Sequence, residues 1–236
     1  MSQIILSVVM GVYNGAEQLA VTLSSVLRQK GASIEFIVID DGSTDQSKAV
    51  LDEWVRRDSR LRVIHQANAG LTRALIRACN TAKGEFIARQ DCGDVSLPGR
   101  FSMQLAALQA NPSLSFVSCG TRYATQDGEF LYEVRGSGKA RMPSDIIDLT
   151  VAHGVQDGPA HHGSVMFRRS AYEKAGGYRP EFYYGQDWDL WYRLAEQGKF
   201  QLLPQTLYEA RIGVGDISMN NKARQELIGQ QSLEAL

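Results

Sequence analysis

Acidic and polar side chains gather at three places in the N-terminal half, and each place directly follows a short apolar segment. The three groups are Val12-Tyr13-Asn14-Gly15, Asp40-Asp41-Gly42-Ser43-Thr44-Asp45 and Asp91-Cys92-Gly93-Asp94. Crowded carboxylates repel one another, so such groups usually have a cation or hydrogen-bond donors to satisfy them. Each group taken alone is equally typical of a turn or a helix cap, because these use the same residue types.

Strand and helix patterns alternate through this half of the chain. We expect strands at 4–10, 34–39, 61–65 and 85–89, and helices at 16–30, 45–57 and 71–82. Short continuous apolar runs are typical of strands buried on both faces of a parallel sheet, and the alternation indicates βαβ units. Ligands of such sheets bind beyond the carboxyl ends of the strands, where the three polar groups lie.

The second half is less regular. We expect helical segments at 101–109, 170–175 and 187–197, strands at 116–120, 130–134 and 164–167, and a loop at 135–141. The prediction is one α/β domain with a mostly parallel, Rossmann-like sheet flanked by helices and a mixed second half. Residues 1–100 form its first half, 101–218 its second, and 219–236 a helical tail.

Composition excludes several classes of protein. Among 236 residues, 44% are hydrophobic and 22% charged, with a net charge of −1 and no basic block, so we expect no nucleic-acid partner. The three cysteines have no paired short spacing and favour a reducing compartment. No apolar run approaches the ~20 residues of a membrane span, and no signal peptide is expected. We therefore expect a cytoplasmic protein, with peripheral membrane association left open.

Six segments together resemble the family 2 inverting glycosyltransferases, which have the GT-A fold. They occur in the family's order and are SVVMGVYNGAEQL (7–19), FIVIDDGSTDQS (36–47), NAGLTRAL (68–75), GEFIARQDCGDVSLPGRF (84–101), HHGSVMFRRSAYEKAGGY (161–178) and GQDWDLWYRLAEQGK (185–199). The pair of segments that contains DDGSTD and GEFIARQD is highly specific. The resemblance implies a transferase that moves a sugar from a nucleotide-diphosphate sugar to an acceptor hydroxyl, with residues 1–100 as the donor half.

The resemblance also implies which residues bind the donor. Val12 and Asn14 would lie against the nucleotide, and Asp41 would accept the imide N–H of uracil or thymine, with Asp40 beside it near the base and ribose. A carboxylate can accept this N–H but cannot pair with unprotonated cytosine, so UDP- or dTDP-sugars are favoured. Two arginines, Arg73 and Arg89, are candidates to offset the diphosphate charge, or else are solvated helix and strand-end residues.

The family's metal-binding run is Asp-x-Asp-Asp, and this sequence departs from it. The corresponding run is Asp91-Cys92-Gly93-Asp94, in which Gly93 replaces the usual metal ligand. Asp91 remains the candidate for a divalent metal, Mn or Mg. Cys92 is expected to be a packed small residue, since no second soft ligand is spaced near it.

On the acceptor side, the resemblance makes Asp187 the catalytic base. Gln186 replaces the family's glutamate before it, and the alternative for Asp187 is a helix N-cap. His162 and Trp188 are further candidates for acceptor contacts, although a loop histidine or a helical tryptophan is often structural. The acceptor is expected to be a saccharide or lipid-linked, in surface polysaccharide or glycan synthesis.

The sequence also leaves three alternatives to an active glycosyltransferase. A catalytically impaired, sugar-nucleotide-binding or partner-binding member of the same fold is favoured by Gly93 and by Gly213, which stands where the family has a late histidine after Arg211. A dinucleotide-binding oxidoreductase is suggested only by the βαβ alternation, since the turn at 11–15 is not G-x-G-x-x-G. A nucleotidyltransferase would need a glycine-rich loop with a lysine for the triphosphate, and the sequence has none.

Overall fold

Four parallel strands and three helices make up the N-terminal half of the computed structural model, which describes residues 4–141 and 158–213. In chain order they are β1 (Leu6–Val12), α1 (Ala16–Leu27), β2 (Ile34–Asp40), α2 (Ser47–Arg57), β3 (Leu61–His65), α3 (Leu71–Thr81) and β4 (Phe86–Arg89). Strand β1 pairs in parallel with β2 and β4, and β2 with β3. Every residue of β2 is buried, as the continuous apolar run predicts.

The second half extends the same sheet with mixed strand directions. It contains β5 (Val95–Ser96), α4 (Arg100–Ala110), β6 (Leu114–Thr125), β7 (Phe130–Val134), β8 (Ala140–Arg141), the 3₁₀ turn η1 (His162–Ser164), β9 (Met166–Arg168), α6 (Arg169–Lys174), α7 (Gln186–Ala195) and β10 (Lys199–Ile212). Within the described residues the sheet has ten strands, and its main path is β3-β2-β1-β4-β9-β6-β10-β5. Strand β9 is antiparallel to both β4 and β6, and it joins the two halves.

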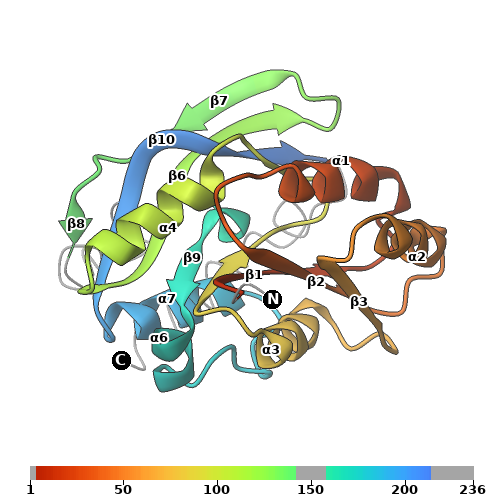
Figure 1. Cartoon of the computed structure of the whole chain (residues 1–236), viewed down its shortest axis with the longest axis horizontal. Coiled ribbons are helices and arrows are strands. Elements are labelled where there is room, and N and C mark those ends of the chain that lie inside the picture. Colours follow the sequence, from red (N-terminus) through yellow and green to blue (C-terminus); the bar gives the residue numbers. More distant parts are fainter. Residues whose placement is uncertain (1–3, 142–157, 214–236) are drawn as a thin grey trace.

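Helices cover both faces of the sheet (Figure 1). One core cluster packs α1, α2 and α4 against strand residues such as Val8 and Met10. The other packs α3, α6 and α7 against residues such as Val9 and Ile37. Neighbouring residues of β1 thus serve opposite cores, because successive side chains of a strand point to opposite faces. The expected α/β domain with a sheet flanked by helices is confirmed.

The structure corrects three predictions in the second half. The 14-residue strand β10 was not predicted, because Pro204 interrupts its pattern. Pro204 lies at a register shift between Leu203 and Thr206, where the missing N–H is tolerated. Strand β6 is longer than expected, and β8 lies in the segment expected to be a loop. The predicted helical tail at 219–236 lies outside the described residues.

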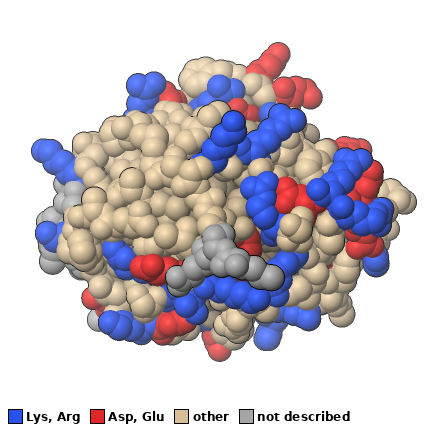
Figure 2. Space-filling model, viewed as in Figure 1, with Lys and Arg blue, Asp and Glu red and all other residues tan. Residues whose placement is uncertain are grey.

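Charges of both signs mix on the surface. Figure 2 shows Lys and Arg side chains beside Asp and Glu side chains over α2, where Lys48 pairs with Asp52 and Arg57 with Glu53. Among the helices within 4–141 and 158–213, none has both the length and the apolarity that crossing a membrane requires.

One buried arginine ties the two halves together. Arg100, the first residue of α4, is fully buried, and its guanidinium donates to the carbonyl oxygens of Arg89 at 2.8 Å and Gly163 at 2.6 Å. Its other acceptors are Gln90 Oε1 at 3.0 Å, Ser96 Oγ at 2.9 Å and Gln104 Oε1 at 3.1 Å. The guanidinium therefore fixes the end of β4 relative to η1.

We predict that Arg100→Met lowers the free energy of unfolding by at least about 3 kcal/mol, because it leaves several buried oxygens without a donor. Urea denaturation checks this, with Arg56→Met as the control. Arg56 is exposed on α2, and its replacement should change stability by less than about 0.5 kcal/mol. Equal losses for the two variants would contradict the role assigned to Arg100.

Candidate active site

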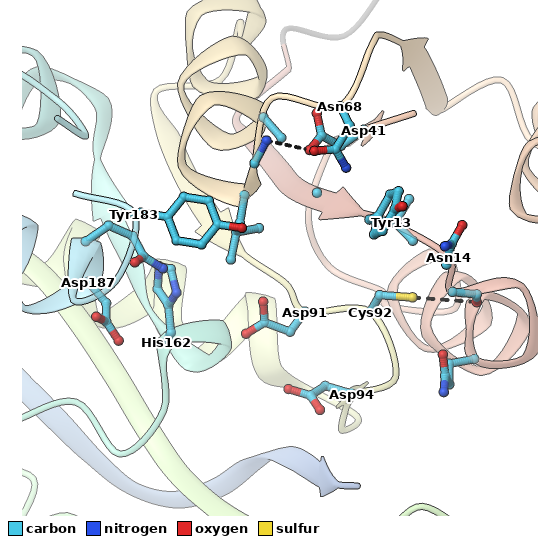
Figure 3. A pocket seen from close by; sticks show the side chains of 18 of the residues that line it. Tyr13, Asn14, Asp41, Asn68, Asp91, Cys92, Asp94, His162, Tyr183 and Asp187 are labelled. Atoms are coloured by element: carbon cyan, nitrogen blue, oxygen red, sulfur yellow. Dashed lines mark hydrogen bonds between the residues drawn. The ribbon is translucent and has the colours of Figure 1, made fainter. Parts of the chain in front are cut away.

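A pocket of about 690 Å³ opens at the carboxyl ends of β1, β2 and β4 (Figure 3). Residues of η1 and the start of α7 close its opposite side, so both halves of the chain contribute. The lining residues with polar side chains include Asn14, Asp41, Asn68, Asp91, Asp94, His161, His162, Gln186, Asp187 and Arg211. The edge of the sheet on which the sequence places its polar groups is therefore the edge that carries the pocket.

The loop after β1 lines the pocket with Val12 and Asn14. Asn14 has a positive φ of 53°, a conformation that asparagine tolerates better than most residues. Its side-chain Oδ1 accepts hydrogen bonds from the N–H groups of Thr44 at 2.8 Å and Asp45 at 3.3 Å. Asn14 thus joins the loop after β1 to the loop after β2 and fixes the shape of both.

Asp41 is buried in the loop after β2 and lines the pocket. Its Oδ1 accepts from Ala69 N at 2.9 Å and Gln66 Nε2 at 2.6 Å, and its Oδ2 accepts from Gly70 N at 2.8 Å. A carboxylate offers about four lone-pair sites, so these three hydrogen bonds leave room for one further donor. The same residue therefore shapes the loop before α3 and faces the pocket.

Asp40, in contrast, is not among the residues that line the pocket. Its Oδ2 lies 2.7 Å from His65 Nδ1, and its Oδ1 accepts from Ser43 N at 3.1 Å. Asp41, the next residue, lies in the loop after β2 and does line the pocket. Asp40 therefore helps to hold β3 and the turn at Ser43, and its expected place near the base and ribose stays a prediction.

Three side chains that could bind a metal converge in the same pocket. Single ligand atoms of Asp91, Asp94 and His161 lie within 4.8 Å of one another. His161 Nδ1 is 3.8 Å from Asp91 Oδ2 and 3.6 Å from Asp94 Oδ2. Two carboxylates and an imidazole suit a divalent cation such as Mn²⁺ or Mg²⁺. His161 Nδ1 also accepts from Gly163 N at 3.1 Å, so ligation through Nδ1 would replace that hydrogen bond.

Arg89 lies behind this cluster and does not line the pocket. It is fully buried, and its guanidinium pairs with Asp91 Oδ1. Burial alone would raise the pKa of Asp91, but the positive charge of Arg89 outweighs it and holds that pKa below its usual value. The expected phosphate ligand is therefore a residue that keeps Asp91 ionised and in place.

The other arginines are also placed differently from the expectation. Arg73 is exposed on α3 and does not line the pocket, because the buried face of that helix is formed by residues such as Ala74 and Ala78. Arg211 near the end of β10 does line it, and its Nε pairs with Glu209 Oε1 at 2.9 Å. Among the described residues that line the pocket, the guanidinium comes from Arg211.

Gly93 has a φ of +98°, a conformation that residues with side chains rarely adopt. Its N–H donates to Thr22 Oγ1 at 2.9 Å. A Cβ at this position would meet only the Gln18 side chain, at 3.8 Å, so space is not what restricts the position. Glycine is the residue that adopts this backbone conformation at no steric cost.

Asp187 lines the pocket from the second position of α7. The N-cap of this helix is Gly185, so the alternative role for Asp187 as an N-cap is wrong. Its Oδ1 accepts from Trp188 N at 3.0 Å. Burial raises the pKa of Asp187 above the ordinary 3.8, despite the opposing effect of this hydrogen bond. A partly dehydrated, more basic carboxylate therefore faces the cavity.

Of the two other acceptor-side candidates, His162 lines the pocket and Trp188 does not. His162 lines the pocket, and its Nε2 lies 2.8 Å from Tyr178 Oη. Burial, assisted by the nearby Arg89 charge, lowers the pKa of His162 to about 3, so the imidazole is neutral near pH 7. Trp188 is absent from the pocket lining and packs against the core, edge-on to Trp191 with ring centroids 5.1 Å apart.

Sequence reasoning missed some residues of this site. Asp94 and His161 were passed over in favour of Asp91 and His162, and the aromatic side chain of Tyr183 was not considered. The only signal for His161 is the pair of adjacent histidines, of which sequence cannot tell which one faces Asp91. In Figure 3, Tyr183 lies between Asp187 and the two residues Asn68 and Asp41, which come from the loops after β3 and β2.

Comparison with known proteins identifies relatives along most of the chain. The model of the family described as Glycosyl transferase family 2 matches residues 7–176. EpsE of Bacillus subtilis is 33% identical over 210 residues, which cover 87% of this chain and 72% of EpsE. Glycosyltransferase GlyG of Streptococcus pneumoniae is 33% identical over 137 residues, 58% of this chain and 45% of GlyG. The chain thus spans less than half the length of GlyG.

Solved structures share the fold at low sequence identity. TarS 1–349 of S. aureus in complex with UDP has a TM-score of 0.72 and 16% identity, over 96% of this chain and 65% of that one. Mannosyltransferase PcManGT of Pyrobaculum calidifontis, in complex with GDP-Man and Mn²⁺, has a TM-score of 0.71 and 18% identity, over 98% and 64%. From the matched family, the relatives and the shared architecture, the chain belongs to glycosyl transferase family 2 and has the GT-A fold.

Proposed function

We propose that this glycosyltransferase moves a sugar from a UDP- or dTDP-sugar to an acceptor hydroxyl and inverts the anomeric configuration. The observation that carries the proposal is that Asp41 and Asp187 lie on opposite sides of one pocket, with Asp91 between them (Figure 3). One carboxylate is available to a nucleobase and the other to an acceptor hydroxyl. The volume of about 690 Å³ is in the range of small-molecule sites.

The base of the donor would bind at Asp41. The hydrogen bonds from Ala69, Gly70 and Gln66 hold its carboxylate still and leave one lone pair for the N3–H of uracil or thymine. Asn14 fixes the adjoining loops, and Val12 offers an apolar contact. A structure of TarS contains UDP, which agrees with this choice of nucleotide, whereas the PcManGT structure contains GDP-Man.

The diphosphate would lie over the cluster of Asp91, Asp94 and His161. A divalent cation held by these three residues would supply positive charge to the leaving nucleoside diphosphate. Arg211, which also lines the pocket and whose backbone N–H donates to Asp94 Oδ1 at 2.9 Å, would add to that charge. Arg89 keeps Asp91 ionised, which favours cation binding.

Asp187 would act as the general base. It takes the proton of the acceptor hydroxyl while that oxygen bonds to the anomeric carbon, and the bond from this carbon to the diphosphate oxygen breaks. Attack and departure on opposite faces invert the configuration. Its raised pKa makes the carboxylate a better base, and general-base assistance is typically worth ~10²–10⁴-fold in rate.

The acceptor would be a saccharide, free or lipid-linked, in the synthesis of a surface polysaccharide. Relatives named chondroitin synthase and hyaluronan synthase, both from Pasteurella multocida, are 24% and 25% identical over 220 and 215 residues. The match covers only 22% and 21% of those two proteins. A lipid-linked acceptor would bring the enzyme to the cytoplasmic face of a membrane.

A second candidate is a catalytically impaired member that binds a sugar nucleotide or a partner. Gly93 favours it, because the residue that usually holds the metal is missing. The positions of Asp94 and His161 beside Asp91 argue against impairment, because the three side chains together could still hold a metal ion. Incubation with UDP-, dTDP- and GDP-sugars, with and without Mn²⁺, separates the two. Nucleotide release with a product of inverted anomeric configuration in NMR supports transfer, and donor binding without release supports impairment.

Asp187→Asn should lower kcat by about 10²–10⁴-fold and leave the affinity for UDP unchanged, because asparagine keeps the shape and loses the basicity. Donor turnover and calorimetry with UDP measure the two effects. Asp127→Asn, an exposed residue outside the pocket, is the matched control and should have wild-type turnover. Near wild-type transfer by Asp187→Asn would remove it from the reaction.

The value of kcat/KM should increase with pH as one group loses its proton, and the pKa of this group should lie above 3.8, the ordinary aspartate value. The base works only when deprotonated, so activity falls as pH decreases through the raised pKa of Asp187. Asp127→Asn, which changes an exposed carboxylate outside the pocket, is the control that should leave the acid limb in place. An acid limb at or below pH 3.8, or one that shifts in the Asp127→Asn variant, would contradict this assignment.

Asp41→Ala should weaken UDP binding by at least about tenfold, more than Asp45→Ala does. Asp45 accepts from Ser47 N at 2.9 Å and Ala16 N at 3.1 Å, so its carboxylate supports the starts of α2 and α1. Calorimetry with UDP on both variants, with melting temperatures measured in parallel, makes the comparison. Equal affinities would take Asp41 out of the nucleotide site.

Gly93→Asp should tighten Mn²⁺ binding in the presence of UDP and lower stability by about 1–3 kcal/mol, since φ of +98° is strained for any side chain. Gly93→Ala is the matched control, because it carries the same strain without the carboxylate. Calorimetric Mn²⁺ titration and urea denaturation give both quantities. If the aspartate and alanine variants bind Mn²⁺ equally, the position does not face the cation.

A further inference from the structure

Strand β7 exposes four large apolar side chains in a five-residue strand. The exposed fractions are 62% for Phe130, 48% for Leu131, 50% for Tyr132 and 37% for Val134. A register shift in the pairing with β6 leaves Leu131 without an opposite residue, so the usual alternation of buried and exposed positions is lost. Contiguous exposed apolar side chains on an edge strand are typical of an interaction surface.

The strand lies at the rim of the molecule. In Figure 1 it forms the outer side of its hairpin with β6, far from α3 and α6. Within residues 4–141 and 158–213, β6 is the strand with which β7 pairs. Tyr132 stacks on Tyr123 with ring centroids 4.4 Å apart. This ring is already ordered, so less side-chain entropy is lost when a partner covers it.

Opposite charges border the strand at equal distances from its centre. Glu129 precedes β7 by one residue, and Arg135 follows it by one, so each is three positions from Tyr132. Arg135 is 68% exposed and pairs with Glu133. Two antiparallel copies of β7 centred on Tyr132 would place Glu129 of each copy opposite Arg135 of the other. The edge is therefore complementary to itself, as a two-fold interface requires.

We infer that β7 is a self-association surface, on which a second copy of this chain packs its own β7 in the antiparallel direction. The strand has the acidic pair Asp127 and Glu129 at one end and Arg135 at the other, and this mixture of charges argues against an anionic membrane surface, which binds clusters of basic residues. A five-residue strand gives a small contact, and small interfaces are typical of weak, transient association. The dimer is accordingly expected at micromolar protein concentrations.

Sedimentation velocity from low to high micromolar concentration tests the inference. The wild type should shift from monomer to dimer, and Phe130→Ser should weaken association by at least about tenfold. Val55→Ser is the control, since Val55 is also an exposed apolar residue, on α2. Melting temperatures establish that the variants are folded. A wild type that is monomeric throughout, or that Phe130→Ser leaves unchanged, would overturn the inference.

Charge reversal tests the register. Glu129→Arg and Arg135→Glu should each be monomeric alone, because like charges then face each other. Mixed in equal amounts, the two variants should form a heterodimer, and the double variant should dimerise like the wild type. Failure of the mixture to associate would overturn the antiparallel arrangement. The alternative outcome is a wild type that stays monomeric and co-sediments with phosphatidylglycerol vesicles. If Phe130→Ser then abolishes this co-sedimentation, β7 is a membrane-binding surface and the inference is overturned.

Discussion

The hydrogen bonds of the buried Arg100 guanidinium join the two parts of the chain that carry the acidic loop and the histidine turn of the pocket. They reach the carbonyl oxygens of Arg89 and Gly163, which belong to the two halves of the chain. Asp91 follows Arg89 by two residues, and His161 and His162 precede Gly163, so one side chain fixes the distance between the acidic loop and the histidine turn. Without the Arg100 guanidinium, these oxygens would be buried without a hydrogen-bond donor. Removing this side chain is therefore costly in free energy.

The carboxylates of the site have a second role in shaping the backbone. Asp41 accepts two N–H groups before α3, and Asp94 accepts from Tyr208 Oη at 2.7 Å and Arg211 N at 2.9 Å. These hydrogen bonds order the loops before any ligand binds. A site ordered in this way loses little further entropy on binding. Asp187 is different, because it is held by the start of its own helix and its burial raises its pKa.

Sequence predicted the parallel half of the fold well, since strands buried on two faces are continuous apolar runs. It did not predict β10, whose Pro204 breaks the pattern at a register shift. The resemblance predicts Asp41, Asp91 and Asp187 as site residues, and all three line one pocket, while their roles stay predictions. It misplaced Arg73 and Arg89, because which face of a helix or strand is covered depends on tertiary packing. The convergence of Asp94 and His161 on Asp91 comes from segments far apart in the chain, and spacing carries no sign of it.

We propose that one pocket holds the nucleotide at Asp41 and its diphosphate, with a cation, at Asp91, Asp94 and His161. The decisive experiment is a crystal structure of the protein with UDP and Mn²⁺, recorded at a wavelength where manganese scatters anomalously. We expect the uracil imide on the Asp41 carboxylate and an anomalous peak between Asp91, Asp94, His161 and the phosphates. UDP bound outside this pocket, or the base seated beside Asp187 with the peak elsewhere, would contradict it.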